Sequence, residues 1–182
     1  MIRRAGEHAV VPWANGLGTT AVIARSPDID DWVWRLSLAD VVTDGPFSTM
    51  PGIDRWIAVA AGDGMDLSID GGEPVRIQHH DPAYAFDGGA VTSCRLLDGP
   101  IRDLNLMLRR GAASGSLELH RLAPNETLHA PADTMAMVVL DGGVHCGRGT
   151  LHEGDAVVVQ DEPVGVIEAV SQARVAFARI RG

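Results

Sequence analysis

Glycine turns recur every eight to twelve residues along this chain, and the apolar segments between them are short. Its 21 glycines and 10 prolines are 31 of 182 residues, above the ~12% that is usual for the two types together. Short segments at this spacing are typical of a β-sandwich or a β-barrel. No long amphipathic helix is evident. We therefore predict an all-β protein, with strands at 56–61, 65–69, 117–122, 134–140, 156–160, 164–169 and 174–180 in addition to the two segments described next.

Two segments alternate with the period of a strand, in which successive side chains point to opposite faces. In residues 32–39, Arg35 and Ser37 lie on the face opposite the tryptophans and leucines. In residues 103–109, one face carries Asp103, Asn105, Met107 and Arg109, opposite three leucines. Such a polar face lies either in solvent or in a polar lumen, and the mixture of arginine, asparagine and serine favours the lumen.

The charge of the chain disfavours nucleic acid and anionic membranes as partners. Its formal net charge is -9, its pI is about 5.1, and no run of lysine or arginine exceeds two residues. No apolar run approaches the ~18 residues of a membrane span. The N-terminal arginines are followed by no apolar core, so no signal peptide is expected. We expect a cytoplasmic protein in which Cys94 and Cys146 stay reduced.

Five motifs occur in one order between residues 12 and 110. They are P-W-x-N-G-x-G-T-T, W-R-x-S-x-A-x-V, D-G-P-F-S, P-G-x-D-R and D-x-N-x-M-x-R-R. In this order they resemble the HutD/Ves family of double-cupin proteins. The resemblance implies two β-barrel-like jelly-roll halves in one compact chain, and the C-terminal half follows by architecture alone. We place the boundary in the glycine-containing joint at 111–115, which gives halves 1–111 and 112–182, although the first strand or two can cross into the other sheet.

The first motif departs from the family pattern, which usually reads P-W-K-N-G-G-G-x-T-x-E. This chain has Ala14 at the lysine position, Leu17 at the middle glycine and Val22 at the glutamate position. The loss of a cation together with an anion indicates a lost ion pair or a changed ligand.

The histidines do not match the ligand pattern of metal-dependent cupins, in which a His-x-His, a glutamate and a later histidine converge on one cation. His79 and His80 are adjacent and therefore point to opposite faces. His145, Cys146 and His152 form a weaker alternative, because they need a hairpin to meet. No G-x-S-x-G nucleophile motif occurs. We predict that the protein binds no metal and no cofactor, and the sequence indicates no catalytic residue.

Arg35 and Arg109 are cations placed in the middle of apolar strands, where a charge needs a partner. One alternative is an internal ion pair with Asp103, Asp54 or Asp40. The other is a guanidinium that holds a ligand carboxylate through two parallel hydrogen bonds. On this second interpretation, the predicted ligand-binding set is Trp13, Asn15, Thr19, Thr20, Arg35, Ser37, Phe47, Asn105, Met107 and Arg109.

We therefore predict that the N-terminal half binds a small polar or carboxylate metabolite without a metal. The resemblance implies a link to histidine utilisation, in which urocanate or a formylated glutamate derivative is sensed or buffered. A cupin isomerase or hydrolase with an Asp or His acid/base is the first alternative. The second is a stress-related protein or a homodimerisation module that uses a face with Trp32, Trp34 and Trp56.

Overall fold

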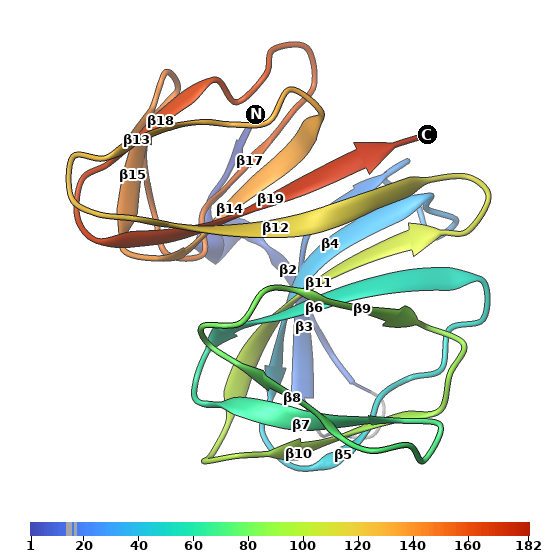
Figure 1. Cartoon of the computed structure of the whole chain (residues 1–182). Coiled ribbons are helices and arrows are strands. Elements are labelled where there is room, and N and C mark those ends of the chain that lie inside the picture. The colour runs from blue at the N-terminus through green and yellow to red at the C-terminus, as the bar shows by residue number, and fades with distance from the viewer. Residues whose placement is uncertain (14–15, 17) are drawn as a thin grey trace. The chain divides into compact units, whose positions relative to one another are not determined.

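The computed structural model describes residues 1–13, 16 and 18–182. The chain divides into two compact units (Figure 1). We call Ala9–Ser114 the N-terminal unit, and Met1–His8 together with Gly115–Gly182 the C-terminal unit. The expected boundary at 111/112 lies near this division. Residues 1–8, expected in the N-terminal half, instead belong to the C-terminal unit, because strand β1 (Ile2–Arg3) pairs with β17 (Ala156–Val158).

The N-terminal unit is built from two sheets. The first has the order β2-β3-β4-β11-β6-β9. Its strands are β2 (Ala9–Pro12), β3 (Gly18–Ser26), β4 (Trp34–Val41), β11 (Ile101–Arg109), β6 (Ile53–Ala61) and β9 (Tyr84–Asp87). The second has the order β5-β10-β7-β8. Its strands are β5 (Gly45–Pro46), β10 (Thr92–Leu96), β7 (Gly64–Ile69) and β8 (Val75–Gln78).

The core of this unit lies between its two sheets. Val41, Val59 and Ile101 from the first sheet belong to the same buried cluster as Met65 and Leu67 from the second. These side chains are almost fully removed from water, which is the main favourable contribution to folding. The inner face of the first sheet is therefore apolar at one end, whereas the polar side chains of β4 and β11 occupy the other.

The C-terminal unit also has two sheets around a separate core. The sheet order β1-β17-β14-β19-β12 is completed by β14 (Thr134–Asp141), β19 (Ala173–Arg181) and β12 (Ser114–Leu122). The order β13-β18-β15-β16 consists of β13 (Thr127–His129), β18 (Val166–Ala169), β15 (Gly143–Cys146) and β16 (Gly149–His152). A short 3-10 helix, η1 (Ala5–Glu7), follows β1. Phe177, Met137 and Ile167 are fully buried in this core.

The structure confirms the predicted all-β class (Figure 1). Each predicted strand segment overlaps an observed strand, although β4 begins at Trp34, β17 ends at Val158 and β18 begins at Val166. The glycine-rich stretch 12–20 joins β2 to β3, which pair antiparallel. The Trp13 N–H donates to the Gly18 carbonyl at 2.9 Å. A Cβ on Gly18 would lie 2.3 Å from the backbone oxygen of Asp40, so a side chain there would collide with the neighbouring strand. Thr19 and Thr20 of the first motif are part of β3.

Within the described residues, no helix combines the length and apolar character needed to cross a membrane. Cys94 and Cys146 are both free and buried. Cys94 lies in the core of the N-terminal unit, and Cys146 lies in that of the C-terminal unit.

Candidate functional site

The strand register brings polar residues together on one face of the first sheet. Antiparallel pairing sets Ser37 of β4 opposite Asn105 of β11, and Arg35 opposite Met107. On the other side of β11, Arg55 of β6 is also opposite Met107. Side chains opposite each other in a ladder lie on the same face. Three neighbouring strands therefore present two arginines, an amide and a hydroxyl on one surface.

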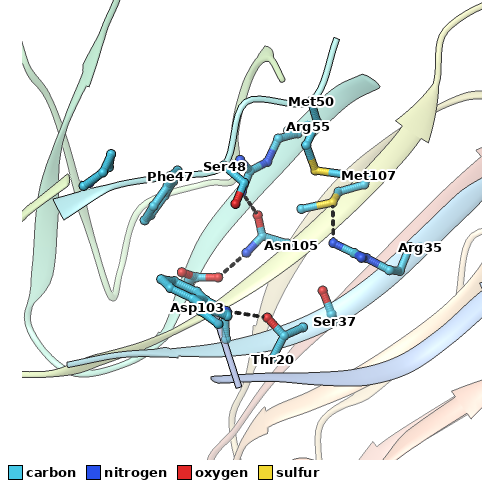
Figure 2. A pocket seen from close by; sticks show the side chains of 13 residues that line it. Thr20, Arg35, Ser37, Phe47, Ser48, Met50, Arg55, Asp103, Asn105 and Met107 are labelled. Atoms are coloured by element: carbon cyan, nitrogen blue, oxygen red, sulfur yellow. Dashed lines mark hydrogen bonds between the residues drawn. The ribbon is translucent and has the colours of Figure 1, made fainter. Parts of the chain in front are cut away.

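This surface forms one wall of a pocket of about 400 Å³ in the N-terminal unit. That volume falls within the range of sites that bind small molecules. The residues after β5 supply a second wall of mostly apolar side chains, as Figure 2 shows for Phe47 and Met50. The lining residues are Trp13, Thr20, Arg35, Ser37, Ala39, Pro46, Phe47, Ser48, Met50, Arg55, Asp103, Asn105 and Met107.

A chain of hydrogen bonds connects Arg55, Asn105 and Asp103 at the base of the pocket (Figure 2). The Nη2 of Arg55 donates to the Oδ1 of Asn105 at 2.8 Å. The Nδ2 of Asn105 donates in turn to the Oδ1 of Asp103. All three side chains are buried. Asn105 thus separates a buried cation from a buried carboxyl group, and these two groups do not form a direct ion pair.

Burial shifts the pKa of both ionisable ends of this chain. Burial raises the pKa of Asp103 to about 7, although the charge of Arg55 opposes this shift and that of Asp40 adds to it. Burial lowers the pKa of Arg55 to about 10. Arg55 is therefore a cation at neutral pH, whereas Asp103 is close to the midpoint of its titration. A carboxyl group with this pKa can gain or lose a proton at physiological pH.

Among the described residues, no carboxylate contacts Arg35. Its Nη2 lies 3.0 Å from the Sδ of Met107, and its Cζ lies 5.0 Å from the centre of the Trp32 ring. Its Nε is buried without a hydrogen-bond partner, as is the Nε of Arg55. Burial and the nearby charge of Arg25 lower the pKa of Arg35. An anion in the pocket would offset this unfavourable environment.

Trp13 is fixed at the edge of the pocket by contacts on two sides. Its indole N–H donates to the Oγ1 of Thr20 at 2.8 Å. Its ring packs edge-on against Phe47, with 6.3 Å between the ring centres. Phe47 also lies under the guanidinium of Arg55, whose Cζ is 5.4 Å from the ring centre. The aromatic wall is therefore connected to one of the two cations.

Most of the residues predicted from the sequence line this pocket, whereas two do not. The pocket-lining members of the predicted set are Trp13, Thr20, Arg35, Ser37, Phe47, Asn105 and Met107. Thr19 lies in a separate open hollow, where its hydroxyl contacts Asp40. Arg109 forms an ion pair with the exposed Asp31, with 2.6 Å between the charged atoms. Asn15, and with it Ala14, lies outside the described residues.

The predicted alternative of an internal ion pair is wrong for Arg35. Among the described residues, Asp40 pairs with Arg102, Asp54 pairs with Arg110, and Asp103 has no cation within ion-pair distance. For Arg109 an ion pair does form, but with a partner that the sequence did not indicate. Arg109 is the last residue of β11, and its ion pair with Asp31 holds its guanidinium at the surface.

Arg55 and the role of Asp103 in the pocket wall were missed. Arg55 closes the motif P-G-x-D-R, and Asp103 was predicted on the polar face and as an ion-pair partner but was not included in the ligand-binding set. A strand period of two places Arg55 on the same face as Ile57 and Val59, both of which are buried. An arginine in register with two core residues was the signal that could have identified it.

Neither a cluster of metal ligands nor an exposed tryptophan patch is present among the described residues. In the part of the chain that the structure describes, no three His, Cys, Asp or Glu side chains gather as metal ligands would. The three tryptophans expected on one exposed face do not form such a patch. Trp32 packs against Ile53 and Met107, Trp34 is buried, and Trp56 is half-buried.

Comparison with known sequences identifies relatives along most of the chain. The family model described as HutD matches residues 5–177. An uncharacterized 21.2 kDa protein in the hutC 3' region of Pseudomonas putida is 45% identical over 106 residues, which are 57% of this chain and 55% of that protein. Protein Ves of Cronobacter sakazakii is 35% identical over 101 residues, 54% of each. The matched region spans just over half the length of these curated relatives.

Solved structures resemble the whole chain. A conserved protein of unknown function from Pseudomonas aeruginosa PAO1 has a TM-score of 0.89 at 32% identity, covering 100% of this chain and 98% of that one. HutD from Pseudomonas fluorescens SBW25, in a formate condition, has a TM-score of 0.80 at 29% identity, covering 100% and 99%. YhhW from Escherichia coli, at 12% identity over 98% and 96%, has a TM-score of 0.72 and is similar in fold alone. The predicted double-cupin fold is confirmed.

Proposed function

Because the chain belongs to the HutD family, we propose that its N-terminal unit binds a small carboxylate metabolite, without a metal, and thereby senses or buffers that metabolite in histidine utilisation. One observation carries the proposal. Arg35 and Arg55 enter one pocket, and neither forms an ion pair with a described residue. A buried cation without a partner is costly, and a carboxylate ligand would remove that cost.

The remaining walls of the pocket suit a ligand with both apolar and polar parts. Trp13, Phe47 and the two methionines provide apolar contact, and Ser37 and Asn105 provide hydrogen-bonding groups close to the guanidinium groups. This combination of an apolar lining and a few converging polar groups is common in small-molecule sites. A volume of about 400 Å³ also exceeds what a single-carbon acid needs, since one water in the liquid occupies about 30 Å³.

The link to histidine utilisation is supported by the relatives. One of them is named for its position beside hutC, and a solved structure of HutD was obtained in a formate condition. We therefore choose urocanate, N-formylglutamate and formate as the first candidate ligands. The first two carry a carboxylate on a larger body, as the shape of the pocket favours.

Calorimetric titration of the three acids into the wild type and into Arg35→Ala tests the proposal. We expect binding to the wild type and an affinity about 10- to 150-fold lower in the variant, because a charged hydrogen bond contributes roughly 1.5–3 kcal/mol. Arg109→Ala is the matched control, since this arginine lies on the neighbouring strand but pairs with Asp31 at the surface. Equal affinity in wild type and Arg35→Ala would exclude the carboxylate role of Arg35.

Catalysis is a second candidate function, favoured by the position of Asp103. This carboxyl group lines the same pocket as both arginines, and its pKa of about 7 suits an acid/base. A carboxylate held at Arg35 could then lose a proton from the adjacent carbon to Asp103 and regain one on the same or a neighbouring carbon, as in an isomerase. Proton NMR of N-formylglutamate in D₂O would reveal such turnover as enzyme-dependent deuterium incorporation at a carbon next to a carboxylate. An Asp103→Asn variant with unchanged incorporation would exclude this residue.

A further inference from the structure

We propose that the pocket takes up its anionic ligand together with one proton, and that Asp103 holds this proton. The inference rests on the proposed function, because it concerns the same pocket and the same carboxylate ligand. If Asp103 takes up a proton on binding, the affinity for the ligand depends on pH.

The position of Asp103 makes its charge sensitive to the contents of the pocket. Only 1% of the residue is accessible, yet it belongs to the pocket lining. Among the described residues, the hydrogen bond that its side chain accepts comes from Asn105. In Figure 2, Asn105 lies between Asp103 and Arg55, so the carboxyl group is not in contact with the cation. Asp103 therefore has less stabilisation of its charged form than a salt-bridged carboxylate has.

Charged and titratable groups face Asp103 from three neighbouring strands. Arg55 of β6 favours the ionised form and Asp40 of β4 opposes it. Cys94 of β10 also interacts with Asp103, but burial raises the pKa of that thiol to about 11, so it is neutral. The pKa of Arg55 is about 10. Of Asp103, Arg55 and Cys94, it is Asp103 that changes charge near pH 7.

A bound carboxylate would shift this balance toward the protonated form in two ways. It brings a second negative charge into a buried space, and like charges raise the pKa of a carboxyl group. It also accepts hydrogen bonds from Arg55, which weakens the stabilisation that the charge of Arg55 gives to ionised Asp103. By thermodynamic reciprocity, if ligand binding favours protonation, then protonation favours ligand binding. Affinity should therefore be greatest below the pKa of free Asp103 and should fall above it.

The number of charges on the ligand should matter as well. With Asp103 protonated, Arg35 and Arg55 give the pocket two positive charges, which match a dicarboxylate. With Asp103 ionised, one of these charges is neutralised. A dianion should therefore be more strongly coupled to the proton than a monoanion is, and formate serves as the monoanionic comparison.

Isothermal titration calorimetry with N-formylglutamate at pH 6 to 9 tests the inference. Both carboxylates of this probe stay ionised throughout that range, so the ligand itself exchanges no proton. Titrations at each pH in two cationic buffers that differ in ionisation enthalpy measure the protons taken up, and such buffers do not compete for an anion site. We expect uptake close to zero at pH 6 and approaching one at pH 8. The dissociation constant should rise up to about tenfold per pH unit above pH 7, which is the limit for one coupled proton.

Asp103→Asn is the matched variant, because it keeps the shape of the side chain and cannot titrate. We expect it to bind with the affinity that the wild type has at low pH and to take up no proton at any pH. If that variant does not fold, the carboxyl carbon of Asp103 can be followed by ¹³C NMR in the wild type, where its titration should move to higher pH when the ligand is added.

The outcomes separate this inference from the proposed function. Absence of binding with every acid across the pH range would overturn the proposed function itself. Binding with the same affinity at pH 6 and pH 9 and no proton uptake would leave the proposed function standing and overturn the inference. Coupling that persists in Asp103→Asn would place the proton on another group and would also overturn it.

Discussion

Burial makes the ionised form of Asp103 unfavourable. Its pKa of about 7 in the folded chain lies well above the 3.8 of an ordinary aspartate. A carboxyl group with a raised pKa binds its proton more tightly when folded, so folding is favoured most below both values. As pH rises from about 4 to about 7, this contribution is lost, and above pH 7 it changes no further.

The raised pKa of Asp103 should make the stability of the protein depend on pH, and Asp103→Asn should remove this dependence. Between pH 5 and 7, the free energy of unfolding of the wild type should fall relative to the variant by about 1.4 kcal/mol per pH unit at most. Urea unfolding of both ligand-free proteins at pH 5, 6, 7 and 8 measures the difference. A difference that stays constant over this range would mean that Asp103 does not titrate as its buried position implies.

The sequence predicted the polar face formed by β4 and β11, but it did not predict every residue on that face. The period of two in the strand segments correctly grouped Arg35 with Ser37, and Asn105 with Met107. It could not show that Arg55 would meet Asn105, since that contact depends on β6 pairing with β11. The exposed position of Arg109 depends on Asp31, which lies in a loop without a periodic pattern.

Strands β2 and β3 position one wall of the pocket, which includes Trp13 and Thr20. Gly18 begins β3, and a Cβ there would lie 2.3 Å from the Asp40 oxygen and 3.2 Å from the ring of Trp13. Gly18→Ala should therefore push β3 away from β4 and displace Trp13. We expect a loss of about 1–3 kcal/mol in the free energy of unfolding, as in other overpacked sites, together with weaker ligand binding.

Gly147→Ala is the control for this substitution, because a Cβ at Gly147 meets no atom within 4 Å. Urea unfolding should show a change within about 0.5 kcal/mol for the control. A Gly18→Ala protein as stable as the wild type would mean that β3 can shift without cost, contrary to the close packing of the hairpin.

Segments with continuous apolar runs were predictable as strands, whereas some of the shorter strands were not. The segments at 56–61 and 134–140 contain continuous apolar runs, and both are central strands. Strand β8 (Val75–Gln78) and strand β16 (Gly149–His152) each have four residues with mixed exposure. Four residues of mixed character carry too little pattern to distinguish a strand from a loop, and their pairing partners define them instead.

For the whole molecule, the main departure from the sequence prediction is where the first eight residues belong. Asp155 in the C-terminal unit accepts hydrogen bonds from Arg4 at 2.7 Å and from the Ala5 N–H at 3.0 Å. The ring of His8 lies 2.9 Å from the Gly154 oxygen. No local pattern in residues 1–8 indicates these contacts, because they depend on groups about 150 residues away.

Asp155→Ala should accordingly destabilise the C-terminal unit by on the order of 2–3 kcal/mol, since it removes charged hydrogen bonds from a buried site. Hydrogen exchange followed by mass spectrometry should show faster exchange in β1, β14 and β17. Exchange in β4 and β11 should change little, because the two units have separate cores. Glu153→Ala, at an exposed position nearby, is the control. Equal acceleration in both units would contradict this separation.

On the proposed function, Arg35 and Arg55 make this pocket a carboxylate site. A crystal structure of the protein grown with N-formylglutamate tests it most directly. We predict a carboxylate oxygen of the ligand within about 2.7–2.9 Å of a guanidinium nitrogen of Arg35 or Arg55, with its body against Trp13 and Phe47. A ligand bound elsewhere, or an empty pocket in crystals grown at a ligand concentration that saturates the protein in solution, would mean that the two arginines do not form a carboxylate site.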